Sequence, residues 1–105
     1  MLQLRLLLEY HCYPLWRYNQ NGEFIDNDLP AELKNHADIS TLLEEIQSDF
    51  DNLFIDNNMV FDYSGFVNDN SRKIFSEKVN CIEVLLLKAI GDNYILENRI
   101  DVSKL

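Results

Sequence analysis

Two segments of the chain carry apolar residues at the spacing of an amphipathic helix, and they limit the possible folds more than any other feature. In the first segment the apolar residues recur every three or four positions: Ile39, Leu42, Leu43, Ile46, Phe50, Leu53 and Phe54. The second segment, expected as a helix over 71–90, has a wider stripe: Ile74, Phe75, Val79, Ile82, Leu85, Leu86, Ala89 and Ile90. Each stripe must pack on another apolar surface, which the rest of the chain has to supply.

The residues beside these segments predict where the helices begin and end. Asp38 or Ser40 is expected to cap the first helix, because short polar side chains accept hydrogen bonds from the free amides there. Asp69 or Asn70 should cap the second helix, and Gly91 should end it, because glycine adopts the left-handed conformation without a steric penalty.

The remaining apolar segments have the pattern of strands. Residues 2–13 alternate between two faces, one of them apolar throughout, which is typical of a half-buried strand. Leu15–Tyr18 and Phe24–Ile25 should pair as a hairpin across the turn rich in asparagine and glycine between them. Further extended stretches are expected at Met59–Tyr63 and Tyr94–Asp101.

These elements predict a single α+β domain over residues 1–105. The expected architecture is a two-layer sandwich: a mostly antiparallel sheet of three to five strands, with both amphipathic helices packed on one of its faces. Hydrophobic residues make up 47% of the 105 positions, which is sufficient for one core.

The charge of the chain is concentrated in one segment. Of the 18 acidic residues, eleven lie between Glu23 and Asp62, where Lys34 is the single base, and the net charge of the whole chain is −9. Such a chain repels nucleic-acid phosphates and anionic membrane surfaces, whereas it attracts basic proteins. No apolar run approaches the roughly 18 residues of a membrane-spanning helix. We therefore expect a cytoplasmic protein that binds neither nucleic acid nor membrane.

No pattern in the sequence indicates catalysis or a cofactor. On a strand, His11 and Cys12 would point to opposite faces, so they would not form a nucleophile–base pair. Residues 17–28 partly match a calcium-binding loop, but Arg17 stands where the ion needs a carboxylate. We expect no enzyme activity, no cofactor and no metal, and two reduced thiols at Cys12 and Cys81.

The residues expected to contact a partner combine carboxylates with aromatic side chains. Trp16 and Tyr18 are candidate anchors, because tryptophan and tyrosine are enriched at the energetic centres of interfaces. The first helix shows acids without interleaved lysine or arginine on its polar face, which suggests a surface that attracts a basic partner. The candidate acidic residues are Asp26, Asp28, Glu44, Glu45, Asp49, Asp51 and Asp56.

In size, charge and organisation, the chain resembles the small acidic immunity proteins of bacterial polymorphic and contact-dependent growth inhibition toxin systems. The resemblance is carried by the segment Tyr10-His-Cys-Tyr-Pro-Leu-Trp-Arg-Tyr18, followed by Asn21-Gly22 and Asp26-Asn-Asp-Leu-Pro30. It implies that the partner is a cognate, cationic toxin domain, often a nuclease or another enzyme directed at RNA or DNA. An acidic surface could occupy the phosphate-binding cleft of such an enzyme.

Two other classes of function stay open at this point. An acidic adaptor or regulatory subunit of a host complex would explain the charge equally well, and a small hydrolase built around His11 or the carboxylates ranks lower. The expected state is a monomer or a weak homodimer, because the N-terminal strand could lie at a sheet edge and pair with a second copy.

Overall fold

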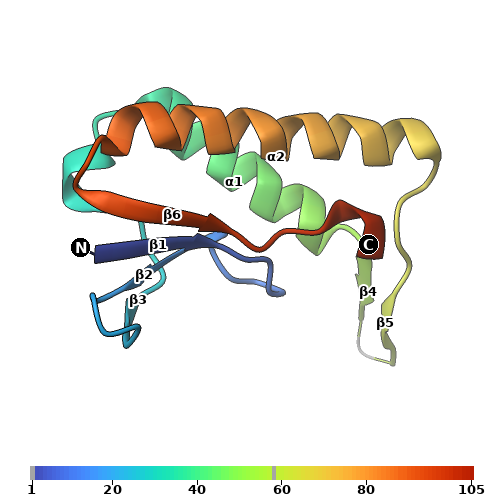
Figure 1. Cartoon of the computed structure of the whole chain (residues 1–105). Helices are drawn as coiled ribbons and strands as arrows, with labels where there is room; N and C mark the ends of the chain where they lie inside the picture. The colour runs from blue at the N-terminus through green and yellow to red at the C-terminus, as the bar shows by residue number, and fades with distance from the viewer. Residues whose placement is uncertain (1, 58) are drawn as a thin grey trace.

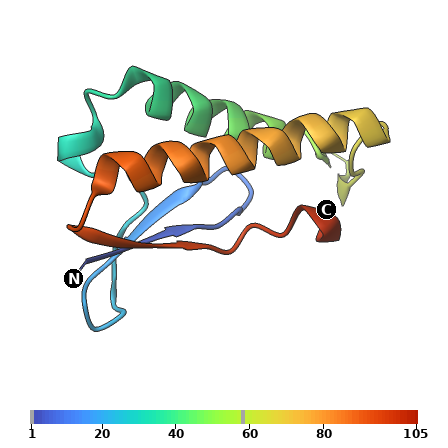
Figure 2. The ribbon, with the colours of Figure 1, turned by 45° about the horizontal axis from the view of Figure 1, so that its top comes forward.

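The structure is a computed structural model that describes residues 2–57 and 59–105, and it confirms the α+β class (Figure 1). The elements in chain order are β1 (Leu2–Leu6), β2 (Leu15–Tyr18), β3 (Phe24–Asp26), the short 3-10 helix η1 (Ala31–Leu33), α1 (Ala37–Asp51), β4 (Phe54–Asp56), β5 (Phe61–Tyr63), α2 (Asp69–Ile90), β6 (Tyr94–Asn98) and the 3-10 helix η2 (Val102–Lys104). Both α-helices lie on one side of the main sheet, as Figures 1 and 2 show.

The main sheet has the strand order β3-β2-β1-β6. The N-terminal strand β1 therefore lies inside the sheet, between β2 and β6, and the expectation that it could lie at an edge is wrong. The pairings β1–β2 and β2–β3 are antiparallel, as the sequence predicts, whereas β1 and β6 run parallel. The parallel pairing arises because the chain crosses over the sheet through α2 before it returns as β6, beside β1. A helical crossover is the usual way to join strands of one sheet in parallel.

The core lies between the two α-helices and the covered face of the sheet. Leu4, Leu6 and Leu15 of the sheet are fully buried there. They meet buried residues of the two helical stripes: Ile39, Leu43, Ile46 and Phe50 from α1, and Phe75, Val79, Ile82, Leu86 and Ile90 from α2. The predicted stripes therefore lie on the buried faces of both helices, except for Ile74 at the start of the second stripe, which is 46% exposed.

The helix ends differ slightly from the sequence-based expectation. α1 begins after His36 with no side-chain cap, and Asp38 lies inside its first turn. α2 is capped by Asn68, whose Oδ1 accepts a hydrogen bond from the Ser71 amide at 2.8 Å, and not by Asp69 or Asn70. Gly91 ends α2 with φ +55°, as expected.

The first strand is shorter than its alternating pattern predicts. β1 ends at Leu6, and residues 7–14 form a turn in which the Leu7 amide donates to the Pro14 carbonyl at 3.0 Å. His11 adopts φ +60° there, and the Cys12 amide donates to the Glu9 carbonyl. The expectation that His11 and Cys12 project from opposite faces of a strand is therefore wrong, because both lie in the turn. The last strand likewise ends at Asn98, before the predicted Asp101.

A second, two-stranded sheet stands apart from the main one. β4 and β5 pair antiparallel, with Phe54 opposite Tyr63 and Asp56 opposite Phe61. The sequence pattern extends the first helix to residue 54, but α1 ends at Asp51. The chain leaves the helix there because the Leu53 carbonyl accepts hydrogen bonds from the Ser64 amide at 2.7 Å and the Gly65 amide at 3.1 Å. Figure 1 shows the hairpin projecting beyond the helix–sheet body.

Candidate protein-binding surface

Two of the predicted acidic residues are neutralised near the β2–β3 hairpin. Asp26 accepts two hydrogen bonds from the guanidinium of Arg17, one of them with Nε at 2.6 Å. These bonds hold the pKa of Asp26 below its ordinary value. Asp28 lies 3.3 Å from the ammonium of Lys34, and both side chains remain more than half exposed. The carboxylates in this loop therefore carry less free charge than the sequence suggests.

The acidic face of α1 meets a cation that comes from α2. The ammonium of Lys78 lies 2.7 Å from Asp49 Oδ2 and 3.9 Å from Glu45 Oε2. The polar face of the helix is therefore not free of bases, although its own sequence contains none. The contact joins the two helices at their surface, where such a pair stabilises the fold by about 1 kcal/mol or less.

Asp51 and Asp56 bind the turn formed by residues 7–14. Asp51 Oδ1 accepts a hydrogen bond from the His11 amide at 2.9 Å, and Asp56 Oδ2 accepts one from the Tyr10 hydroxyl at 3.1 Å. Loss of hydration raises the pKa of Tyr10, and the bond to Asp56 raises it further. The hydrogen-bond partners of both carboxylates are neutral groups, so neither carboxylate is paired with a cation among the described residues.

Glu44 is exposed on α1 and forms no ion pair with any described residue. Burial raises the pKa of Tyr13 to about 12, and the negative charge of Glu44 contributes to this increase. Within the described residues, seven carboxylates between Glu23 and Asp62 are without an ion pair: Glu23, Glu32, Asp38, Glu44, Asp51, Asp56 and Asp62. A negative field thus remains along this segment after the four paired acids are set aside.

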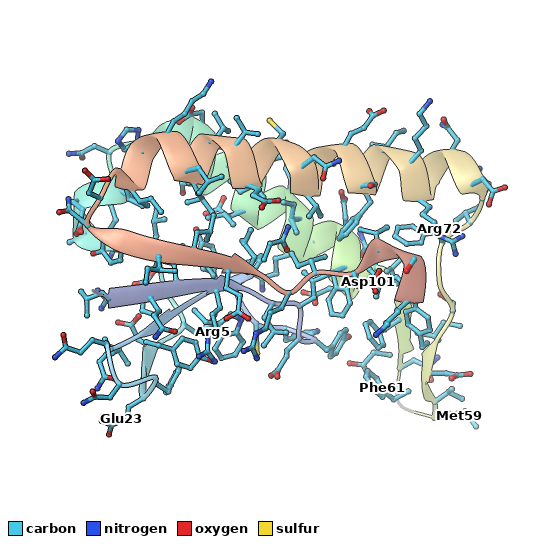
Figure 3. The ribbon with its side chains drawn as sticks, in the orientation of Figure 1. Arg5, Glu23, Met59, Phe61, Arg72 and Asp101 are labelled. Atoms are coloured by element: carbon cyan, nitrogen blue, oxygen red, sulfur yellow. The ribbon has the colours of Figure 1, made fainter. Side chains whose placement is uncertain are left out.

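Trp16 and Tyr18 lie on the face of the main sheet that the helices leave uncovered. They stand opposite Arg5 and Gln3 in the sheet register, on the side away from buried Leu4 and Leu6. Figure 3 shows Arg5 on this helix-free side. Trp16 Nε1 donates to the Leu7 carbonyl at 3.0 Å, and the guanidinium carbon of Arg5 lies 3.9 Å from the centre of the Tyr18 ring. Both aromatic residues are half-buried in intramolecular contacts.

The β4–β5 hairpin and the segment that joins it to α2 expose apolar side chains that were not among the predicted contact residues. We call the following residues the hairpin patch: Ile55, Met59, Val60, Phe61, Tyr63 and Val67. Met59 and Val67 are 92% exposed, and Phe61 is 58% exposed. Figure 3 shows Met59 and Phe61 at the projecting end of the hairpin. Large apolar side chains that gather on neighbouring exposed segments are typical of an interaction site.

A cluster of aromatic rings holds the hairpin in place. The rings of Phe54 and Phe61 stack, with centres 5.6 Å apart and planes inclined by 6°. Tyr10 packs against both of these rings, at 4.7 Å and 5.0 Å, and Tyr63 packs against Phe54 at 5.1 Å. Phe50 of α1 extends the contacts toward the core. These ring contacts therefore fix the position of the hairpin that carries the patch.

Two carboxylates stand within the hairpin itself. Asp56 lies on the same face as Phe54, Phe61 and Tyr63, while Asp62 pairs with Ile55 on the opposite face. Each face of the hairpin thus combines exposed apolar side chains with one negative charge. A sequence signal for this element exists in the two similar segments Phe54-Ile55-Asp56 and Phe61-Asp62-Tyr63, which flank a short asparagine-containing turn.

A shallow groove of about 260 Å³ lies beside the hairpin, between the end of α1 and the start of α2. Its apolar lining includes Leu53, Phe66, Val67, Ile74 and Phe75.

No cluster of metal-ligating side chains occurs in residues 2–57 and 59–105, and none of the helices in that part of the chain could span a membrane. In comparisons with known proteins, no family model matches the sequence and no curated protein is significantly similar to it.

Proposed function

We propose that this chain is a cytoplasmic binding protein that neutralises a cognate bacterial toxin domain by protein–protein association. The expected toxin is cationic and directed at nucleic acid. The acidic surface would cover the positive side chains with which the toxin binds phosphates, so that nucleic acid and this chain compete for the same partner.

The observation that carries the proposal is the set of seven carboxylates in residues 23–62 that have no ion pair among the described residues. Glu44, Asp51, Asp56 and Asp62 belong to α1 or to the hairpin that follows it. Charges that are not neutralised within a protein raise its rate of association with a partner of opposite sign. An acidic regulatory subunit would share this property but would not suppress cleavage of nucleic acid.

The proposal is tested by capture and inhibition. The tagged chain is incubated with a lysate of the organism that encodes it, and bound proteins are identified by mass spectrometry at low and at high salt. We expect a basic protein that cleaves RNA or DNA when purified and loses that activity when the chain is added. Capture of a partner whose activity on nucleic acid is absent or unaffected would refute neutralisation.

A matched pair of variants controls for the total charge. The first carries Glu44→Gln, Asp56→Asn and Asp62→Asn, and the second carries Asp69→Asn, Glu77→Gln and Asp92→Asn. All six carboxylates are exposed and form no ion pair with a described residue. We expect the first variant to lose inhibition and the second to retain it. Equal loss in both would mean that net charge matters but this surface does not.

A further inference from the structure

We propose that the hairpin patch inserts into an apolar depression, bordered by lysine and arginine side chains, on the basic partner. This inference rests on the proposed function and adds to it the element that makes the central contact. Three observations favour it: the apolar side chains of the patch are exposed, the hairpin that carries them is held by packed aromatic rings, and the carboxylates beside them form no ion pair with a described residue.

The apolar side chains of the hairpin turn are exposed to water. The turn between β4 and β5 carries Met59 and Val60, which are 92% and 48% exposed, and both lie next to exposed Phe61. Apolar area in contact with water is unfavourable, and its burial in a partner is the main source of affinity at the centre of an interface. Methionine suits such a contact, because its flexible, polarisable side chain adapts to the shape of a pocket.

Ring contacts and hydrogen bonds order the hairpin before any partner binds. The Phe54–Phe61 stack and the contacts of Tyr10 with both rings fix the base of the hairpin. At the turn, Asn57 Oδ1 accepts hydrogen bonds from the amides of Met59 and Val60, both at 2.9 Å. An element that is ordered before binding loses less conformational entropy when it enters a pocket.

The carboxylates around the patch favour a basic protein as its binding partner. Asp56 and Asp62 stand in the two strands, Asp51 lies where α1 leads into the hairpin, and none of them forms an ion pair with a described residue. A partner pocket bordered by cations would therefore gain favourable contacts around its apolar centre. A second copy would bring the same carboxylates face to face across a two-fold axis, which is unfavourable. Anionic lipid would repel them as well.

The charges and the apolar residues should act on different rate constants. The carboxylates act at a distance and set the association rate, whereas the buried apolar contacts set the dissociation rate. Replacement of Met59 and Val60 by serine leaves the ring cluster intact. It should therefore change the dissociation rate without unfolding the hairpin.

The experiment uses two matched valines as sites for a photoreactive side chain. Val60 on the hairpin is 48% exposed and Val84 on α2 is 50% exposed. Each is replaced in turn by p-benzoylphenylalanine, and the full chain is irradiated with the basic protein that the wild-type chain captures. We expect a cross-link from position 60, on a segment of the partner where apolar residues adjoin lysine or arginine, and none from position 84.

The kinetic arm compares the Met59→Ser/Val60→Ser double variant with Val84→Ser. We expect the first to increase the dissociation rate constant by about tenfold or more, as for residues at the centre of an interface, and the second to leave it unchanged. An unchanged dissociation rate in the double variant, or a cross-link from position 84 alone, would overturn the insertion while leaving the proposed function intact.

Other occupants of the patch are outcomes of the same experiment. Cross-linking of position 60 to a second copy, or flotation with phosphatidylcholine vesicles that Met59→Ser abolishes, would overturn the proposed contact in favour of self-association or lipid. Failure to capture any basic protein would remove the proposed function itself, and this inference with it.

Discussion

Lys78 on α2 places its ammonium 2.7 Å from the carboxylate of Asp49 on α1, which joins the two helices across their exposed edge. The contact separates the acids of α1 into two groups. Glu45 and Asp49 share a cation, whereas Glu44 does not. The acidic surface available to a partner therefore lies toward Glu44 and the hairpin.

Replacement of Lys78 by glutamine should lower the free energy of unfolding by about 1 kcal/mol or less, because the pair is partly exposed and screened by solvent. It should also raise the rate of association with a basic partner, since two more carboxylates become free. Urea denaturation and stopped-flow binding measure the two effects. Lys73→Gln is the control, because Lys73 is exposed on the same helix and forms no ion pair with a described residue. A slower association for Lys78→Gln than for Lys73→Gln would contradict this account of α1.

Stability should fall at alkaline pH through Tyr13. Burial raises its pKa from 10.0 in the unfolded chain to about 12 in the folded protein. The unfolded state releases the proton first, so the stabilisation is complete below pH 10 and is lost as the pH rises toward 12. Tyr13→Phe should flatten this part of the stability curve, measured by urea denaturation at several pH values. An alkaline decline of the same steepness in the variant would show that Tyr13 ionises as freely in the folded chain as in the unfolded one.

The start of α2 should depend on Asn68 and not on Asn70. Asn68→Ala removes the side-chain oxygen that accepts a hydrogen bond from the Ser71 amide, and should lower the free energy of unfolding by about 1 kcal/mol. Asn70→Ala is the matched control, since Asn70 lies exposed in the first turn of the helix. Chemical denaturation gives both values, and an equal loss in the two variants would argue against the cap.

The helices and the layered architecture could be predicted because local spacing determines them. The stripe from Phe75 to Ile90 and the one from Ile39 to Phe50 lie on the buried faces of the two helices, because their spacing is that of one helix face. The end of β1 at Leu6 could not be predicted, because the following turn is held by a hydrogen bond from His11 to Asp51, 40 residues away. The alternating pattern of apolar residues continues beyond Leu6 and gives no sign that the strand ends there.

The candidate surface could be predicted only in part from the sequence, because it too depends on contacts between residues far apart in the chain. The negative charge of the segment from Glu23 to Asp62 is visible in the composition, but the cations that pair with Asp26 and Asp49 lie outside that segment, at Arg17 and Lys78. The exposure of Met59 depends on the pairing of β4 with β5. These ion pairs and this strand pairing produce no periodic pattern in the sequence from which they could be predicted.

The central claim is that free carboxylates on α1 and the hairpin direct the chain to a basic partner. The most direct test measures the association rate constant with the captured basic protein as a function of salt, for the wild type and for the Glu44→Gln/Asp56→Asn/Asp62→Asn variant. We predict that the wild-type rate falls steeply with salt, and that the variant associates about tenfold more slowly at low salt with a shallower dependence. An association rate that does not change with salt, or that is the same in both proteins, would contradict the account.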